Sequence, residues 1–144
     1  MRRELTRITK PLVGLSVLAI DDDADSRELV AAILERAGAS VVTACGSDEA
    51  LQLCESRHFD VIVSDLMMPE LCGIELLARI RHLEGARATP AMALSAGGPT
   101  LERQARAAGF ERVERKPITP QCLIAAVASL SRGPSDSDTH AAAE

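Results

Sequence analysis

The sequence SVLAIDDD, residues 16–23, is a short apolar run that ends in three consecutive acidic residues. Short apolar runs bounded by polar or turn-forming residues are typical of strands that are buried on both faces of a parallel sheet. Four further runs of this kind are found at Ser40–Thr43, Val61–Ser64, Ala91–Leu94 and, less regularly, Arg112–Arg115. Segments with helical periodicity separate them, which predicts repeated βα units and therefore an α/β protein with one parallel sheet.

The helical segments carry recognisable start and stop signals. After Asp23, apolar residues recur at three- and four-residue spacing up to Gly38, which is suited to a helix C-terminal cap. Ser47, followed by two acidic residues, is expected to cap a second helix. Apolar residues between Ile74 and Ile80 lie at helical spacing and predict a third helix, and the pairs Gly98-Pro99 and Thr119-Pro120 are expected to open the fourth and fifth helices.

Composition limits the possible functions. The chain has 144 residues, a formal net charge of -5 and only two aromatic residues, Phe59 and Phe110. A negative net charge and so few aromatic rings argue against direct binding of nucleic acid, by either electrostatic attraction or base stacking. Proteins and cations are the expected partners. No apolar stretch has the length of a membrane segment or signal peptide, so we expect a cytoplasmic protein.

The cysteines show neither a zinc-binding nor a redox spacing, and we expect them to be small buried side chains in a reducing compartment. They are Cys45, Cys54, Cys72 and Cys122. The length fits one domain, which we place at residues 15–131. Residues 1–14 are expected to be a basic N-terminal extension or linker, and residues 132–144 a disordered tail.

Polar groups lie at the ends of four of the predicted strands. The acidic triplet 21–23, Asp65, Ser95 and Lys116 each come directly after an apolar run. Ligands of doubly wound sheets bind outside the carboxyl ends of the strands, so we expect these groups to share one crevice. Carboxylates gathered there repel one another unless a cation is bound, and a set of oxygen ligands suits Mg²⁺ or Mn²⁺.

Such a crevice can also capture a phosphoryl group. A bound divalent ion would screen one aspartate so that it could act as a nucleophile and form an acyl phosphate. Lys116 would offer positive charge, and Ser95 a hydroxyl donor, to the phosphoryl oxygens. Some of these residues also have simpler interpretations: Asp23 resembles a helix cap more than a ligand, and Lys116 could be a turn residue before proline.

The set of motifs resembles the receiver domain of two-component response regulators. The likeness rests on Asp21-Asp22, the stretch 65–73 (DLMMPELCG), Ser95-Ala96 and Lys116-Pro117, and it extends over about residues 15–131. The resemblance implies a flavodoxin-like, doubly wound α/β fold with a five-stranded parallel sheet in the order 2-1-3-4-5 and five helices. It also implies a signalling module that promotes only its own phosphorylation and dephosphorylation, not an enzyme acting on other substrates.

The same resemblance implies roles for individual residues. Asp65 would be the phosphoacceptor, supplied by a histidine kinase or a histidine phosphotransfer protein, and a downstream protein target would recognise the result. Mg²⁺ would be bound by the carboxylates of Asp22 and Asp65 and the carbonyl of Met67, with Asp21 acting mainly through water. Ser95 would follow the phosphoryl group, and Lys116 would pair with it.

Three departures from the family pattern affect the signal output and the lifetime of the phosphorylated form. Val113 stands where the family commonly has an aromatic residue that moves inward on phosphorylation. Glu114 in the last strand requires a partner such as Arg112 or Arg115 if it is buried. Met67 and Gly97 offer no polar side chain to orient an attacking water, so we expect slow hydrolysis of the phosphorylated form.

Other functions stay open on sequence grounds. No output domain is expected after residue 131, so the chain is either a single-domain regulator or the receiver of a hybrid sensor kinase, and Val113 mildly favours the latter. The main alternative is a phosphorylation-independent pseudo-receiver that serves as a protein-docking module. A small phosphohydrolase is disfavoured because it would need an acid two residues after the nucleophile, where Met67 stands.

Overall fold

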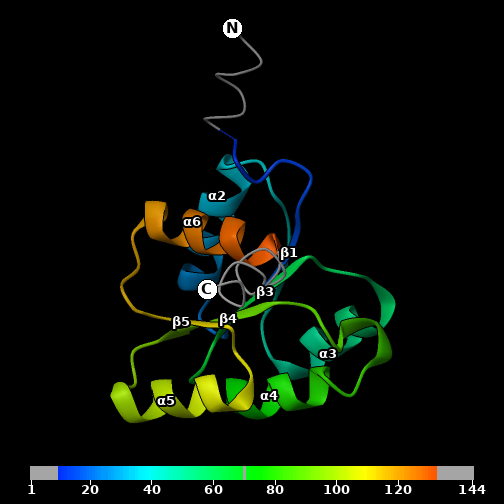
Figure 1. Ribbon diagram of the computed structural model, residues 1–144, viewed down its shortest axis with the longest axis vertical. Helices are drawn as coiled ribbons and strands as arrows, with labels where there is room; N and C mark the ends of the chain where they lie inside the picture. The colour runs from blue at the N-terminus through cyan, green and yellow to red at the C-terminus, as the bar shows by residue number, and fades with distance from the viewer. Residues whose placement is uncertain (1–9, 70, 133–144) are drawn as a thin grey trace, which may run out of the picture.

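The computed structural model describes residues 10–69 and 71–132 of the chain. Most of the expected basic extension, the tail beyond residue 132 and His140 therefore lie outside the described residues, as does Glu70. The two described stretches form one sheet covered by helices on both faces (Figure 1).

The described residues contain a five-stranded parallel sheet in the order β2-β1-β3-β4-β5, which confirms the predicted fold class. The strands are β1 (Ser16–Ile20), β2 (Ser40–Ala44), β3 (Val61–Asp65), β4 (Ala91–Ser95) and β5 (Arg112–Arg115). Strands β2, β3 and β4 each extend one residue further than predicted. Asp65 and Ser95 are thus the last residues of their strands, not the first residues after them.

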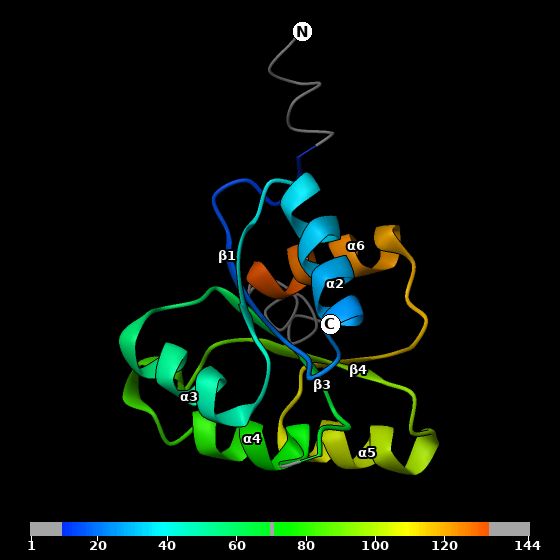
Figure 2. The same ribbon diagram turned by 180° about the vertical axis from the view of Figure 1, so that it is seen from behind.

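The helices are divided between the two faces of the sheet. They are α2 (Ala24–Arg36), α3 (Ser47–Ser56), α4 (Gly73–Ile80), α5 (Pro99–Ala108) and α6 (Pro120–Ser131), with a short 3-10 helix η1 (Glu84–Ala86). Helices α2 and α6 lie on one face, and α3, α4 and α5 lie on the other (Figures 1 and 2). Each face has its own apolar core; Leu34 and Leu123 belong to the first, and Leu77 and Ala105 to the second.

The helix ends agree with the sequence signals in all but one case. The Asp23 carboxylate accepts a hydrogen bond from the Ser26 backbone N–H, and the Thr119 hydroxyl accepts one from the Cys122 N–H, so both residues are N-caps. The prediction that Ser47 is an N-cap is wrong: Ser47 is the first residue of α3, and Gly46 precedes it without a side-chain cap. The Glu49 carboxylate instead accepts a hydrogen bond from the Cys45 N–H at 2.8 Å.

The packed part of the chain begins before residue 15. Leu12, which sequence analysis placed in the extension, is fully buried in the core beneath α2 and α6. Its backbone N–H donates to the Ala37 carbonyl at 2.8 Å, which ties the segment to the end of α2. Val13, the next residue, is 63% exposed. The buried Leu12 side chain therefore extends the core into the turn that precedes β1.

The predictions for the cysteines and for the last strand were only partly confirmed. Cys54 is buried, Cys72 is partly exposed, and Cys45 and Cys122 are exposed, so the expectation of four buried thiols is correct only for Cys54. Cys45 lies just before α3, and Cys122 lies in the first turn of α6. Glu114 pairs with Arg112 at 2.9 Å, as expected for a half-buried acid in β5.

None of the helices in the described residues is both long and apolar enough to span a bilayer.

Candidate functional site

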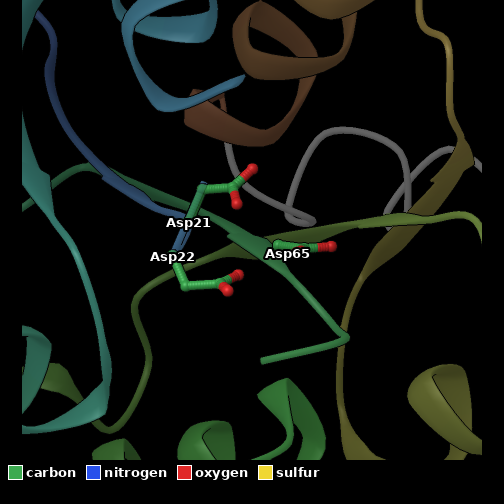
Figure 3. Close-up of side chains that lie close together, drawn as sticks. All are labelled: Asp21, Asp22 and Asp65. Atoms are coloured by element: carbon green, nitrogen blue, oxygen red, sulfur yellow. The ribbon is translucent and has the colours of Figure 1, made fainter. Parts of the chain in front are cut away.

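Three carboxylates gather at the carboxyl edge of the sheet. Asp21 and Asp22 follow β1, and Asp65 ends the neighbouring strand β3. One carboxylate oxygen from each lies within 4.8 Å of the others. Figure 3 shows the three side chains on adjacent parts of the sheet edge. The strand order brings these residues together although 43 positions separate Asp22 from Asp65 in the sequence.

The loop that carries Asp21 is held by hydrogen bonds on several sides. Asp21 is 5% exposed, and its Oδ1 accepts a hydrogen bond from the Asp23 N–H at 3.0 Å. Its own N–H donates to the Ala44 carbonyl at 3.1 Å. The Arg27 guanidinium donates from Nη1 to the Asp21 carbonyl at 2.8 Å. The acidic loop is therefore fixed by β2 and by the first turns of α2.

Lys116 brings a positive charge to the cluster from the end of β5. Its Nζ lies 3.3 Å from Asp65 Oδ1 and 3.4 Å from Asp21 Oδ2. Burial alone would lower the pKa of the Lys116 ammonium, but the two carboxylates outweigh burial and raise the pKa. For Asp65, burial is the largest effect and raises the pKa of the carboxyl, while Lys116 opposes it and Asp21 adds to it.

Ser95 and the loop after Asp65 complete the site. Ser95 is 1% exposed, and its Oγ accepts a hydrogen bond from the Gly97 N–H at 3.1 Å. Its carbonyl accepts one from the Lys116 N–H at 2.9 Å, so β4 and β5 are joined at the site. Gly73, at the start of α4, approaches β3 closely: a Cβ there would lie 2.6 Å from the Asp65 carbonyl oxygen. The chain can fold back behind Asp65 because residue 73 has no side chain.

The donor set matches a hard divalent cation. All three clustered side chains offer carboxylate oxygens, and no cysteine or histidine of the described residues joins them. Oxygen-rich ligation with room for water is typical of Mg²⁺ and Mn²⁺, whereas zinc favours nitrogen and sulfur. The lysine beside two of the acids balances only part of their charge. The site therefore suits both a cation and a tetrahedral anion such as a phosphoryl group.

The structure brings most of the predicted residues together. Asp21, Asp22, Asp65 and Lys116 lie within one cluster, and Asp23 caps α2 instead of joining them. Arg27 was missed by sequence reasoning, because an arginine in the first turns of an exposed helix gives no sign that it bonds a carbonyl of the preceding loop. His58 and His82 lie outside the cluster, as expected.

A model of the response regulator receiver domain matches residues 17–128. The matched residues cover the five strands except for Ser16, the first residue of β1, and the whole acidic cluster, so fold, site and family model agree. The chain belongs to the response regulator receiver domain family.

Relatives of the chain occur in proteins of very different length. An uncharacterised 14.6 kDa protein of Leptolyngbya boryana is 40% identical over 114 residues, which is 78% of this chain and 87% of that protein. The sensor histidine kinase AruS of Pseudomonas aeruginosa is 42% identical over 108 residues, or 73% of this chain, but only 11% of the kinase. Among solved structures, the chemotaxis protein CheY4 of Vibrio cholerae has a TM-score of 0.76 at 32% identity, covering 81% of this chain and 98% of that one.

Proposed function

We propose that Asp65 accepts a phosphoryl group from the phosphohistidine of a histidine kinase or a histidine phosphotransfer protein in the cytoplasm. The observation that carries the proposal is the placement of Asp65 beside two further acids and one lysine at a single edge of the sheet. Asp65 is 8% exposed, so the protein surrounds most of this side chain at the edge of the sheet.

Mg²⁺, or Mn²⁺ in its place, is the cofactor that the proposal requires. The carboxylates of Asp22 and Asp65 and the carbonyl of Met67 would hold the ion, and Asp21 would act through water. When bound, the ion supplies positive charge that reduces the repulsion between a carboxylate nucleophile and the phosphoryl oxygens.

The residues of the chain then perform a simple transfer. A carboxylate oxygen of Asp65 forms a bond to phosphorus while the bond between phosphorus and the donor imidazole nitrogen breaks. The nitrogen keeps the electron pair and takes a proton from solvent. Lys116 already lies 3.3 Å from Asp65 and is placed to pair with the incoming oxygens, and the Ser95 hydroxyl is free to donate its proton to them.

The phosphorylated form is expected to be long-lived. Met67 and Gly97 occupy the positions two residues after Asp65 and two after Ser95, and neither can orient a water toward phosphorus. A half-life measurement in the presence of Mg²⁺ tests this, and turnover as fast as that of a chemotaxis-type regulator would contradict it.

Two settings fit the proposed function. The chain spans most of the short Leptolyngbya protein but about a tenth of the sensor histidine kinase AruS, and this range of lengths is compatible with either a single-domain regulator or the receiver of a hybrid kinase. Val113 is buried and lacks the ring of an aromatic switch, which favours a relay role, because a relay needs less change at the protein surface. Residues 15–131 would be the receiver domain in either setting, with Leu12 packed against it.

Incubation with acetyl phosphate and Mg²⁺, followed by intact mass measurement, tests the proposal. We expect one added phosphoryl group on the wild type, none on Asp65→Asn, and an unchanged adduct on Asp25→Asn, an exposed acid of α2. Absence of an adduct and of phosphate release would support a docking module instead. Continuous phosphate release far above background would indicate a hydrolase.

A further inference from the structure

Met67 is an unusually exposed methionine next to the phosphoacceptor. Among large apolar side chains of the described residues, the strongly exposed ones are Val13, Leu29 and Met67, and Met67 is 60% exposed. Valine and leucine are inert to mild oxidants, whereas a thioether is readily converted to a sulfoxide. Met67 is therefore the one oxidisable member of this group, and it lies two residues after Asp65.

The Met67 sulfur lies against the neighbouring loop of the site. A Cβ built on Gly97 would lie 3.4 Å from Met67 Sδ and 2.5 Å from Leu101 Cδ2, so both side chains are close to the Gly97 backbone. The Gly97 N–H in turn donates to Ser95 Oγ at 3.1 Å. The thioether thus connects the loop after β3 with the loop after β4, beside the hydroxyl that is expected to follow the phosphoryl group.

The surroundings of this sulfur are mostly apolar. Met67, Met68, Pro69 and Leu101, together with Leu66, Cys72 and Asp22, line an open groove of about 470 Å³ that borders the acidic cluster. Asp22 and Cys72 are the polar side chains in this lining, and the others are apolar. A sulfoxide oxygen on Met67 would add a polar acceptor to this mostly apolar lining.

We propose that Met67 is a redox modification site, and that its oxidation to the sulfoxide shortens the lifetime of phosphorylated Asp65. The inference rests on the proposed phosphoacceptor function. The oxidant is a peroxide: the sulfur gives up two electrons and gains one oxygen, and hydrogen peroxide leaves as water. No carbon–sulfur bond breaks, and a sulfoxide reductase reverses the change.

The physical reason is the hydrogen-bonding capacity of the sulfoxide. The thioether is a weak acceptor, whereas a sulfoxide oxygen is a strong one on a larger, polar group. Placed beside Gly97, it would hold a water near the phosphorus of phosphorylated Asp65 and orient it for attack. It therefore supplies the polar group that the sequence lacks at both water-orienting positions.

The other described methionines provide internal controls. Met92 is fully buried in β4, and Met68 is partly buried against the core on the α3–α5 face. Oxidant should therefore modify Met67 before Met68, and should leave Met92 intact while the protein is folded. Met67→Leu keeps the backbone carbonyl and an apolar side chain of similar size but removes the sulfur.

The test treats the whole chain with hydrogen peroxide, maps oxidised methionines by peptide mass, and then measures phosphoryl loss from protein labelled with acetyl phosphate and Mg²⁺. We expect Met67 to oxidise before Met68 and Met92, and the hydrolysis rate to rise about threefold or more. Sulfoxide reductase should restore the original rate, and peroxide should leave the hydrolysis rate of Met67→Leu unchanged.

Three outcomes would overturn the inference. They are oxidation of Met68 or Met92 ahead of Met67, an unchanged hydrolysis rate once Met67 is fully oxidised, and an equal acceleration by peroxide in Met67→Leu. If the unoxidised protein takes up no phosphoryl group, the proposed function fails and the inference fails with it. That result is distinct, because it appears in the untreated sample.

Discussion

The Arg27 guanidinium bonds the Asp21 carbonyl at 2.8 Å and so links helix α2 to the loop that carries two of the clustered acids. Outer contacts that orient the ligands of a metal site commonly change its affinity by about tenfold or more when they are removed. We therefore expect Arg27→Met to weaken Mg²⁺ binding about tenfold, measured by titration calorimetry. Arg36→Met, at the exposed end of the same helix, should bind Mg²⁺ as the wild type does.

The Arg27→Lys variant distinguishes the effect of the positive charge on Mg²⁺ affinity from the effect of the guanidinium geometry. Lysine keeps the positive charge but lacks the rigid fork of donors, so it should recover only part of the affinity. Full recovery would show that charge alone matters, and equal affinity of Arg27→Met and the wild type would exclude a positioning role.

Asp65 is expected to lower the stability of the metal-free protein at neutral pH. Burial raises the pKa of its carboxyl in the folded state, so folding favours the protonated form. We therefore expect Asp65→Asn to raise the free energy of unfolding at pH 7, measured in urea without divalent ions. A lower free energy of unfolding than in the wild type would contradict this.

The pH dependence of this effect has a definite sign. A carboxyl with a raised folded-state pKa binds more protons when folded, so the wild type loses stability as pH rises from about 4 through the folded pKa. Above that pKa the loss is complete. The stability difference between Asp65→Asn and the wild type should therefore be largest at neutral pH and disappear near pH 3, as measured by urea unfolding at several pH values.

Leu12 should be as important for stability as a residue inside the predicted domain. It is fully buried, and truncation of a buried leucine to alanine costs about 3 kcal/mol. Its neighbour Val13 is 63% exposed, so Val13→Ala should change the free energy of unfolding by less than about 0.5 kcal/mol. Equal effects of the two substitutions in urea unfolding would show that the segment does not pack as described.

Local patterns predicted the strands and the polar residues at their ends, and the resemblance to receiver domains supplied the order of the strands in the sheet. Apolar runs marked all five strands to within one residue, and parallel strands necessarily bring Asp21, Asp22, Asp65 and Lys116 to one edge. These predictions needed only strand direction and order. No side-chain contact had to be known in advance.

Features that depend on tertiary contacts could not be predicted. Leu12 lies in a basic stretch without periodicity. It is buried because its segment packs against the end of α2, where its N–H bonds the Ala37 carbonyl. The Ser47 prediction failed because Ser47 is helical and Glu49 bonds the backbone before the helix instead. Proximity of Met67 to Gly97 likewise arises from two loops that are distant in the sequence.

The thiols should differ strongly in reactivity. Burial raises the pKa of the Cys54 thiol to about 11, and Cys54 is 5% exposed, whereas Cys45 and Cys122 are exposed. Because the thiolate is the reactive form, only about one Cys54 in a thousand is ionised at pH 8. In native protein a disulfide reagent should therefore modify Cys45 and Cys122 first, partly exposed Cys72 more slowly, and Cys54 last. Denaturant should make all four react at similar rates, and a double Cys45→Ser, Cys122→Ser variant should lose the fast phase; rapid labelling of Cys54 in folded protein would contradict the buried placement.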